Sequence, residues 1–98
     1  MAINGVSEEQ SQIIKDILQP YSQEYVFFMY GSRINGNFLK NSDLDILIKG
    51  ETKASMDMIE KIREKFDDSN LPFIVHLADF YNLDENFYKL IKNTLVKL

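Results

Sequence analysis

Residues 25–49 read YVFFMYGSRINGNFLKNSDLDILIK, and this stretch decides the fold. Its first six residues are apolar or aromatic, which predicts a buried central strand that stops at Gly31. Residues 43–49 alternate, with aliphatic residues at the even positions and both Asp43 and Asp45 at odd positions. They predict a second strand, with the two carboxylates on one face and a row of apolar side chains on the other.

The segments on either side of this strand pair predict helices and one further strand. Ser7 has capping-box spacing before an apolar helical stripe that ends before Pro20. The other predicted segments are a helix between Lys53 and Asp67, a strand over residues 73–78, a helix capped by Asp84 with Phe87, Leu90 and Ile91 on one face, and a short strand or tail over residues 94–98. The order α-β-loop-β-α-β-α predicts an α+β fold with helices packed on a small sheet.

Length and composition favour one small folded domain over residues 1–98. The chain is 45% hydrophobic and 27% charged, as in folded rather than disordered proteins. A formal charge of −4 argues against direct binding to nucleic acid or an anionic membrane, which requires clustered Lys and Arg. The sequence has no cysteine and no apolar run near the roughly 18 residues of a membrane helix, so we expect a cytoplasmic protein without disulfides.

The ends of the two strands suggest a phosphate site and a metal site. Gly31 and Ser32 follow a strand directly, where backbone N–H groups can surround phosphate oxygens. Asp43 and Asp45 project from one face and together suit a hard cation such as magnesium. Each feature alone is weak, because an Asp-x-Asp pair is more often a solvated strand end. Together they are stronger, since phosphate chemistry commonly needs a metal ion.

The motif formed by Gly31-Ser32, ten intervening positions and Asp43-Leu44-Asp45 resembles the signature of the minimal nucleotidyltransferases of the DNA polymerase β-like superfamily. The resemblance implies a nucleotidyltransferase fold, with a small mixed sheet and helices packed on it. It also implies that Gly31 and Ser32, with Arg33 nearby, bind the triphosphate of ATP. By the same resemblance, Asp43 and Asp45 bind two magnesium ions (Mg²⁺).

The resemblance also implies a reaction and a partner. Such proteins transfer a nucleoside monophosphate to an acceptor hydroxyl and release pyrophosphate, and many are antitoxins that bind a HEPN-domain toxin and AMPylate it on a tyrosine. Nucleotidyl transfer needs a nucleobase pocket and a site that aligns the acceptor with the α-phosphate. Because this short chain has little room for both, we expect a partner, or a second copy of the chain, to supply part of the selection.

Two positions depart from the family pattern. The third carboxylate usually stands on the next strand in a Val-Asp-Leu triplet, where this sequence has Val75-His76-Leu77. Imidazole brings no negative charge and suits transition metals better than magnesium, although its reference pKa near 6.5 permits general-base work. Asp79 is predicted to face away from His76, because the two are an odd number of residues apart. Asn35 stands where relatives often carry arginine, which leaves Arg33 and Lys40 as the nearby cations.

These departures leave two functional hypotheses open. In the first, the protein is an active adenylyltransferase, with Asp43 and Asp45 holding metal and His76 replacing the third carboxylate as a catalytic base. In the second, it is a catalytically impaired binding module that neutralises its partner by direct contact. The alternative interpretation of His76 is a structural or surface residue, because a lone histidine in a strand is more often structural than catalytic.

Overall fold

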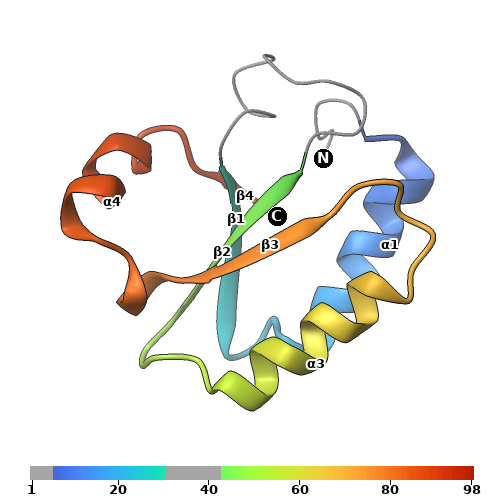
Figure 1. Cartoon of the computed structure of the whole chain (residues 1–98), viewed down its shortest axis with the longest axis horizontal. Helices are drawn as coiled ribbons and strands as arrows, with labels where there is room; N and C mark the ends of the chain where they lie inside the picture. Colours follow the sequence, from blue (N-terminus) through green and yellow to red (C-terminus); the bar gives the residue numbers. More distant parts are fainter. Residues whose placement is uncertain (1–5, 31–42) are drawn as a thin grey trace.

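Four strands form the central sheet of the protein, in the order β3-β2-β1-β4 (Figure 1). The computed structural model describes residues 6–30 and 43–98. The strands are β1 (Tyr25–Tyr30), β2 (Leu44–Gly50), β3 (Val75–Asp79) and β4 (Val96–Lys97). β1 pairs antiparallel with both β2 and β4, and β2 pairs parallel with β3, so the sheet is mixed as predicted. For residues 94–98 the sequence predicted either a short strand or a tail, and the strand β4 confirms the first of these.

The helices of the described residues are α1 (Glu8–Leu18), η1 (Gln19–Tyr21), α3 (Met56–Asp67), η2 (Phe80–Asn82) and α4 (Glu85–Ile91). Two of them, α1 and α4, begin directly after Ser7 and Asp84, the residues that the sequence predicted as caps, whereas α3 begins after Ser55, for which no cap was predicted. The capping box of α1 is complete, because Gln10 N–H donates to Ser7 Oγ and Ser7 N–H donates to Gln10 Oε1, each at 3.1 Å. Asp84 accepts from the Phe87 N–H at the start of α4. The order of elements confirms the predicted α+β fold, and none of the described helices is long and apolar enough to cross a membrane.

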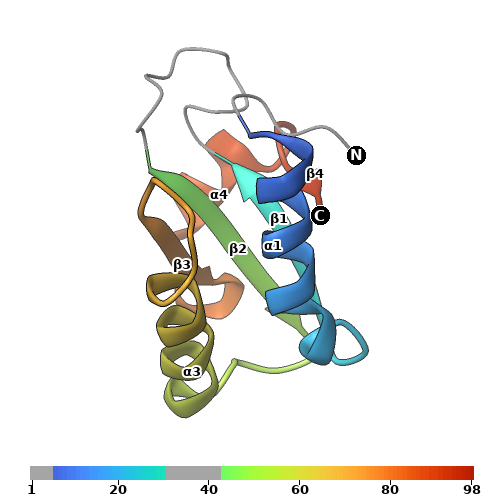
Figure 2. The ribbon, with the colours of Figure 1, turned by 90° about the vertical axis from the view of Figure 1, so that its right-hand side faces the viewer.

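The main core lies between one face of the sheet and the helices α1 and α3 (Figures 1 and 2). Ile14 of α1, Ile46 of β2 and Ile62 of α3 are fully buried there. The even-numbered aliphatic residues of β2 all belong to this core, as their alternation predicted. The odd-numbered residues of β2, among them Asp45, are therefore left to the opposite face.

The short helix α4 lies on that opposite face (Figure 2). Phe87 of α4 makes an edge-to-face contact with Tyr30 at the end of β1, with ring centroids 6.0 Å apart. Ile91 of α4 and Leu47 of β2 are also buried, but neither belongs to the main core between the sheet and the helices α1 and α3. Because α4 has only seven residues, it covers part of the face, and Val26 of β1 remains 37% exposed. The predicted burial of β1 on both faces is therefore correct for the core face and incomplete on the other.

Gly50 ends β2 against the ring of Tyr25, its partner in β1. A Cβ atom at position 50 would lie 2.6 Å from Tyr25 Cδ1 and 3.2 Å from the Glu24 carbonyl oxygen. The Gly50→Ala variant is expected to unfold with a free energy about 1–3 kcal/mol lower, because the ring must be displaced. Urea denaturation measures this, with Thr52→Ala on the exposed loop as a control that changes by less than about 0.5 kcal/mol. Equal urea midpoints for Gly50→Ala and the native chain would contradict this prediction, because they would show that the Tyr25 ring moves aside at no cost in stability.

Candidate active site

Three neighbouring strands bring Tyr30, Asp45 and His76 to one edge of the sheet. Tyr30 of β1 pairs with Asp45 of β2, and Asp45 pairs with His76 of β3. Side chains of directly paired residues lie on the same face of a sheet. The row therefore crosses the face that carries α4, at the edge where the chain leaves β1 and where β2 begins. Residues far apart in the sequence become neighbours here because β2 and β3 run parallel with this register.

Asp43 joins the row through a hydrogen bond to His76. The Nε2 atom of His76 lies 2.7 Å from Oδ2 of Asp43, and the two side chains are 56% and 47% exposed. A carboxylate oxygen can only accept, so Nε2 carries the hydrogen of this bond, and in the neutral form of the ring the lone pair is on Nδ1. An exposed pair of this kind contributes at most about 1 kcal/mol to stability. The contact therefore matters mainly for how it orients the imidazole and occupies one oxygen of Asp43.

Asp45 is half-buried, and its environment disfavours its negative charge. Burial is the largest cause that raises the pKa of its carboxyl, His76 acts in the lowering direction, and the neighbouring charge of Asp43 raises it again. The net effect is a raised pKa. Two carboxylates are thus held near each other with incomplete compensation, which is an arrangement that a bound cation would relieve.

Tyr30 borders the same carboxylate from the β1 side. Burial raises the pKa of the Tyr30 hydroxyl, and the charge of Asp45 raises it further. The phenol is therefore neutral at physiological pH and available as a hydrogen-bond donor. Sequence reasoning treated Tyr30 only as a strand residue, although its position directly before Gly31 is a signal that could have placed it at the edge of the site.

The donor set at this edge fits a divalent cation bound through oxygen. Asp43 and Asp45 offer carboxylate oxygens, which magnesium prefers, whereas His76 offers an imidazole nitrogen. Within residues 6–30 and 43–98, no three carboxylate or imidazole side chains already converge as a metal-binding group. The residues that fit magnesium are therefore the two aspartates, and His76 is an additional side chain bonded to one of them.

The predicted phosphate-binding residues Gly31, Ser32 and Arg33 lie outside the described residues, as do Asn35 and Lys40. The described chain ends at Tyr30 and resumes at Asp43. Tyr30 is the β1 partner of Asp45, so both ends of the intervening segment start from the edge that carries the aspartates and His76. The roles of these five residues remain predictions.

Asp79 does not belong to this constellation, in agreement with the predicted offset. It pairs with Ile48, a core-facing residue of β2, and is only 4% exposed. Its Oδ2 accepts from the Ala54 N–H at 2.7 Å, and its Oδ1 accepts from the Tyr81 N–H at 3.1 Å. Both oxygens therefore fix backbone, one in the connection from β2 to α3 and one at the start of η2, and the role of this carboxylate is structural.

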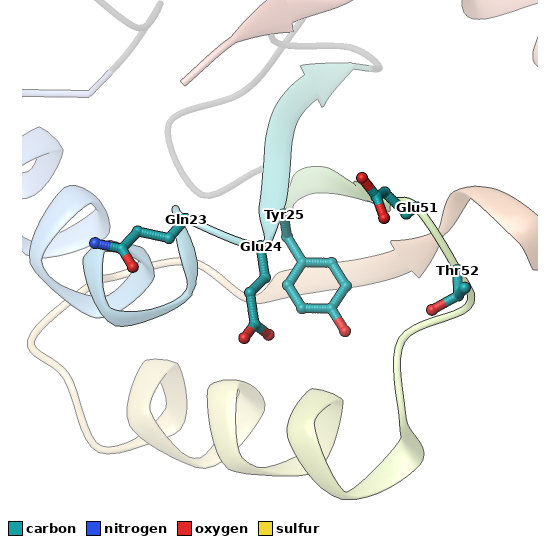
Figure 3. Close-up of a pocket in the computed structure, with 5 residues that line it drawn as sticks. All are labelled: Gln23, Glu24, Tyr25, Glu51 and Thr52. Carbon is teal, nitrogen blue, oxygen red and sulfur yellow. The ribbon is translucent and has the colours of Figure 1, made fainter.

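One cavity opens at the opposite end of β1 and β2, away from the aspartates (Figure 3). It has a volume of about 320 Å³. Because it surrounds Tyr25, it lies five residues, or roughly 17 Å, along β1 from Tyr30. Its lining contains two carboxylates and no basic side chain, which does not suit a nucleoside triphosphate; the lining residues are Gln23, Glu24, Tyr25, Glu51 and Thr52.

Another cavity, of about 380 Å³, has Asp43 in its wall. Its other lining residues come from the end of α3 and the connection to β3, and they are Phe66, Asp67, Leu71, Pro72, Phe73, Ile74 and Val75. Apolar side chains and two carboxylates, Asp43 and Asp67, line it together, and the surface of the cavity is more polar than apolar. Sequence reasoning missed this cavity, because it interpreted residues 73–78 only as a strand.

Comparison with known proteins places the chain in a family. The family model described as polymerase beta, nucleotidyltransferase, matches residues 12–97. The chain belongs to the polymerase beta nucleotidyltransferase family. This nucleotidyltransferase chain is 33% identical over 91 residues to the probable protein adenylyltransferase MntA of Haemophilus influenzae, a match that covers 93% of this chain and 80% of that relative.

The fold of this nucleotidyltransferase chain also has a match among solved structures. A crystal structure of a toxin-antitoxin with AMP-PNP matches it with a TM-score of 0.71 and 18% sequence identity. The match covers 88% of this chain and 69% of the solved one. At this identity the likeness establishes the nucleotidyltransferase-type fold, which the sequence had predicted.

Proposed function

We propose that this nucleotidyltransferase transfers AMP from ATP to a tyrosine hydroxyl of a HEPN-domain toxin and acts as its cytoplasmic antitoxin. The observation that carries the proposal is the meeting of Asp43, Asp45 and His76 at the edge where β1 leads into Gly31-Ser32. The relative named as a probable protein adenylyltransferase supports the AMP donor. The fold match to a toxin-antitoxin structure containing AMP-PNP supports a toxin as the partner.

In this proposal the residues before and at the start of β2 position the nucleotide. Gly31, Ser32 and Arg33 orient the phosphates, and Asp43 and Asp45 bind two magnesium ions. Magnesium, when bound, neutralises charge on the triphosphate. The acceptor oxygen forms a bond to the α-phosphorus, the bond from that phosphorus to the bridging oxygen breaks, and pyrophosphate leaves. Alignment of acceptor and α-phosphate supplies a large part of the rate.

His76 receives the proton that the acceptor hydroxyl loses. With Nε2–H donating to Asp43, the free lone pair is on Nδ1, and the carboxylate stabilises the imidazolium that forms. The exposure of the ring allows a hydroxyl from a separate protein to reach it. Asp43 thus orients the base through one oxygen and offers the other to metal.

The test is transfer of label from ATP to the partner. The chain is incubated with Mg²⁺ and a HEPN-type protein encoded beside it, using ATP labelled at either the α- or the γ-phosphate. Label from α-ATP should appear on the partner and label from γ-ATP should not, which separates AMP transfer from phosphorylation. Absence of α-label on that partner, with a magnesium-free reaction as the blank, would reject the proposal.

One observation favours neutralisation by contact as a second candidate function. At the position where relatives carry a third carboxylate, His76 instead occupies an oxygen of Asp43, a proposed metal ligand. In that case the toxin is inhibited by the bound chain, and Asp43→Asn leaves both the complex and the protection intact. Loss of protection in Asp43→Asn with the complex preserved would exclude this second function.

A further inference from the structure

The short helix α4 and the strand that follows it expose apolar and basic side chains together. Leu90 is 78% exposed, the largest fraction among the large apolar side chains of residues 6–30 and 43–98, and Phe87 is 39% exposed. We propose that the acceptor protein docks on the α4 surface, which consists of Phe87, Leu90, Lys89, Lys92 and Lys97, through apolar side chains flanked by carboxylates. The identity of this partner rests on the proposed function, whereas its docking is tested without ATP.

The apolar part of the α4 surface leads toward the candidate active site. Phe87 and Leu90 are three residues apart in α4, so their side chains are neighbours on the helix. Phe87 also contacts Tyr30, with ring centroids 6.0 Å apart, and Tyr30 is the β1 partner of Asp45. Scattered exposed apolar residues are common on proteins, but adjoining ones with a polar rim mark interaction sites. These side chains adjoin one another up to the edge that carries the aspartates.

The polar rim of the α4 surface is basic. Residues 89–98 contain three lysines and no Asp or Glu, in a chain with a net charge of −4. Lys97 of β4 pairs with Phe28 of β1, whose partner in β2 is Leu47, so the Lys97 side chain is on the face that carries α4. Lys92 and Lys97 are exposed, and neither forms an ion pair with another described residue. Carboxylates of a partner can therefore pair with these lysines without displacing an existing ion pair.

The position of α4 favours the acceptor protein as the occupant. Helices α1 and α3 cover the core face of the sheet, so an acceptor hydroxyl reaches Asp45 from the face that carries α4 (Figure 2). The contacts through Phe87 and Tyr30 place Leu90 roughly 15–20 Å from Asp45. A standard interface covers about 800 Å² on each partner, which is roughly 30 Å across. A protein that presents a tyrosine beside Asp45 through such an interface therefore reaches α4.

Binding without ATP or metal tests the apolar part of the α4 surface. The probe is the purified HEPN-type protein encoded beside the chain, and its affinity is measured by calorimetry. Leu90→Gln should weaken the complex roughly 10–100-fold, because it replaces an apolar contact with a polar side chain. Met56→Gln is the matched control and should bind as the native chain does, because Met56 is 66% exposed at the start of α3, in the opposite layer. Leucine and glutamine have similar helix propensities, so far-UV circular dichroism should show α4 intact.

Charge reversal tests the basic part of the α4 surface. Lys92→Glu should lower the association rate roughly tenfold at low salt, and the difference from the native chain should shrink as salt is added. Lys53→Glu, at an exposed position in the connection from β2 to α3, makes the same change in net charge and should leave the rate nearly unchanged.

The outcomes separate docking from AMP transfer. Equal affinities of Leu90→Gln and the native chain would overturn the proposal, even if the native chain transfers AMP. Weaker binding by Leu90→Gln, when the native chain binds the partner but transfers no AMP, would support the α4 surface and reject the proposed reaction. Absence of any complex with the native chain would overturn both. If the chain alone sediments as a dimer that Leu90→Gln dissociates, the α4 surface binds a second copy, which also overturns the proposal.

Discussion

Asp45→Asn is expected to lower the rate of AMP transfer by about 10²–10³-fold while leaving the fold intact. The amide keeps the size of the side chain but removes the charge that would hold magnesium at the edge shared by β1, β2 and β3. The loss should appear in the transfer of α-label from ATP at saturating partner. Asp57→Asn is the matched control and should retain full activity, because its side chain is 81% exposed and it lies at the start of α3, which follows the end of β2 opposite to Asp45.

The same variant should be at least as stable as the native chain in metal-free buffer. The pKa of Asp45 is raised in the folded protein, mainly by burial, so the folded state binds its proton more tightly than the unfolded state does. The native chain therefore loses stability as the pH rises from the ordinary pKa of an aspartate through the raised folded value. Above that range the charged carboxylate destabilises the folded state by its full amount. Below that range the carboxyl is protonated in both the folded and the unfolded state, so this destabilisation is absent.

Denaturation of both chains from acidic to neutral pH measures this effect. The gap in stability between Asp45→Asn and the native chain should widen with pH in favour of the variant. An Asp45→Asn protein that is both active and less stable at neutral pH would contradict the assignment of Asp45 to a cation site. Reduced activity accompanied by lost stability would instead identify Asp45 as a structural residue.

Much of the fold could be predicted because local chemistry and tertiary packing agree. The capping box at Ser7 and the cap at Asp84 both depend only on hydrogen bonds within four residues, so they survive in the structure unchanged. The alternation in β2 likewise predicted which face is apolar. The predicted apolar face of α4 is less well matched, since Leu90 is 78% exposed beside the buried Ile91. A helical pattern shows which residues align, but the neighbour that covers them depends on the rest of the fold.

The candidate site was only partly accessible from sequence. The spacing of Asp43 and Asp45 indicated a shared face, and resemblance drew attention to His76. The hydrogen bond between His76 and Asp43 joins residues 33 positions apart, and it depends on the parallel register of β2 and β3. Register between distant strands is set by packing of the whole sheet, which no local pattern encodes. The cavity beside Asp43 depends on the same tertiary arrangement.

Asp79→Ala is expected to lower the free energy of unfolding by about 2–5 kcal/mol without a direct effect on the reacting groups. The variant leaves two backbone donors, the Ala54 and Tyr81 N–H groups, without the oxygens that now accept from them. Each buried unpaired donor costs about 1–3 kcal/mol, and the Ala54 donor is in a buried position. Urea denaturation of the metal-free protein measures the loss.

Two further variants separate this role from a generic effect of removing an aspartate. Asp84→Ala removes an exposed cap that accepts one hydrogen bond from Phe87, and it should lower stability by about 1 kcal/mol. Asp79→Asn preserves the shape and one acceptor oxygen, but it turns an NH₂ group toward one of the two donors, so its stability should fall between those of Asp79→Ala and the native chain. If Asp79→Ala were no less stable than Asp84→Ala, the buried carboxylate would not be the anchor of the β2–α3 connection. Retained AMP transfer by the folded fraction of Asp79→Asn would show that the reaction does not need the charge of Asp79, in contrast to the loss expected for Asp45→Asn.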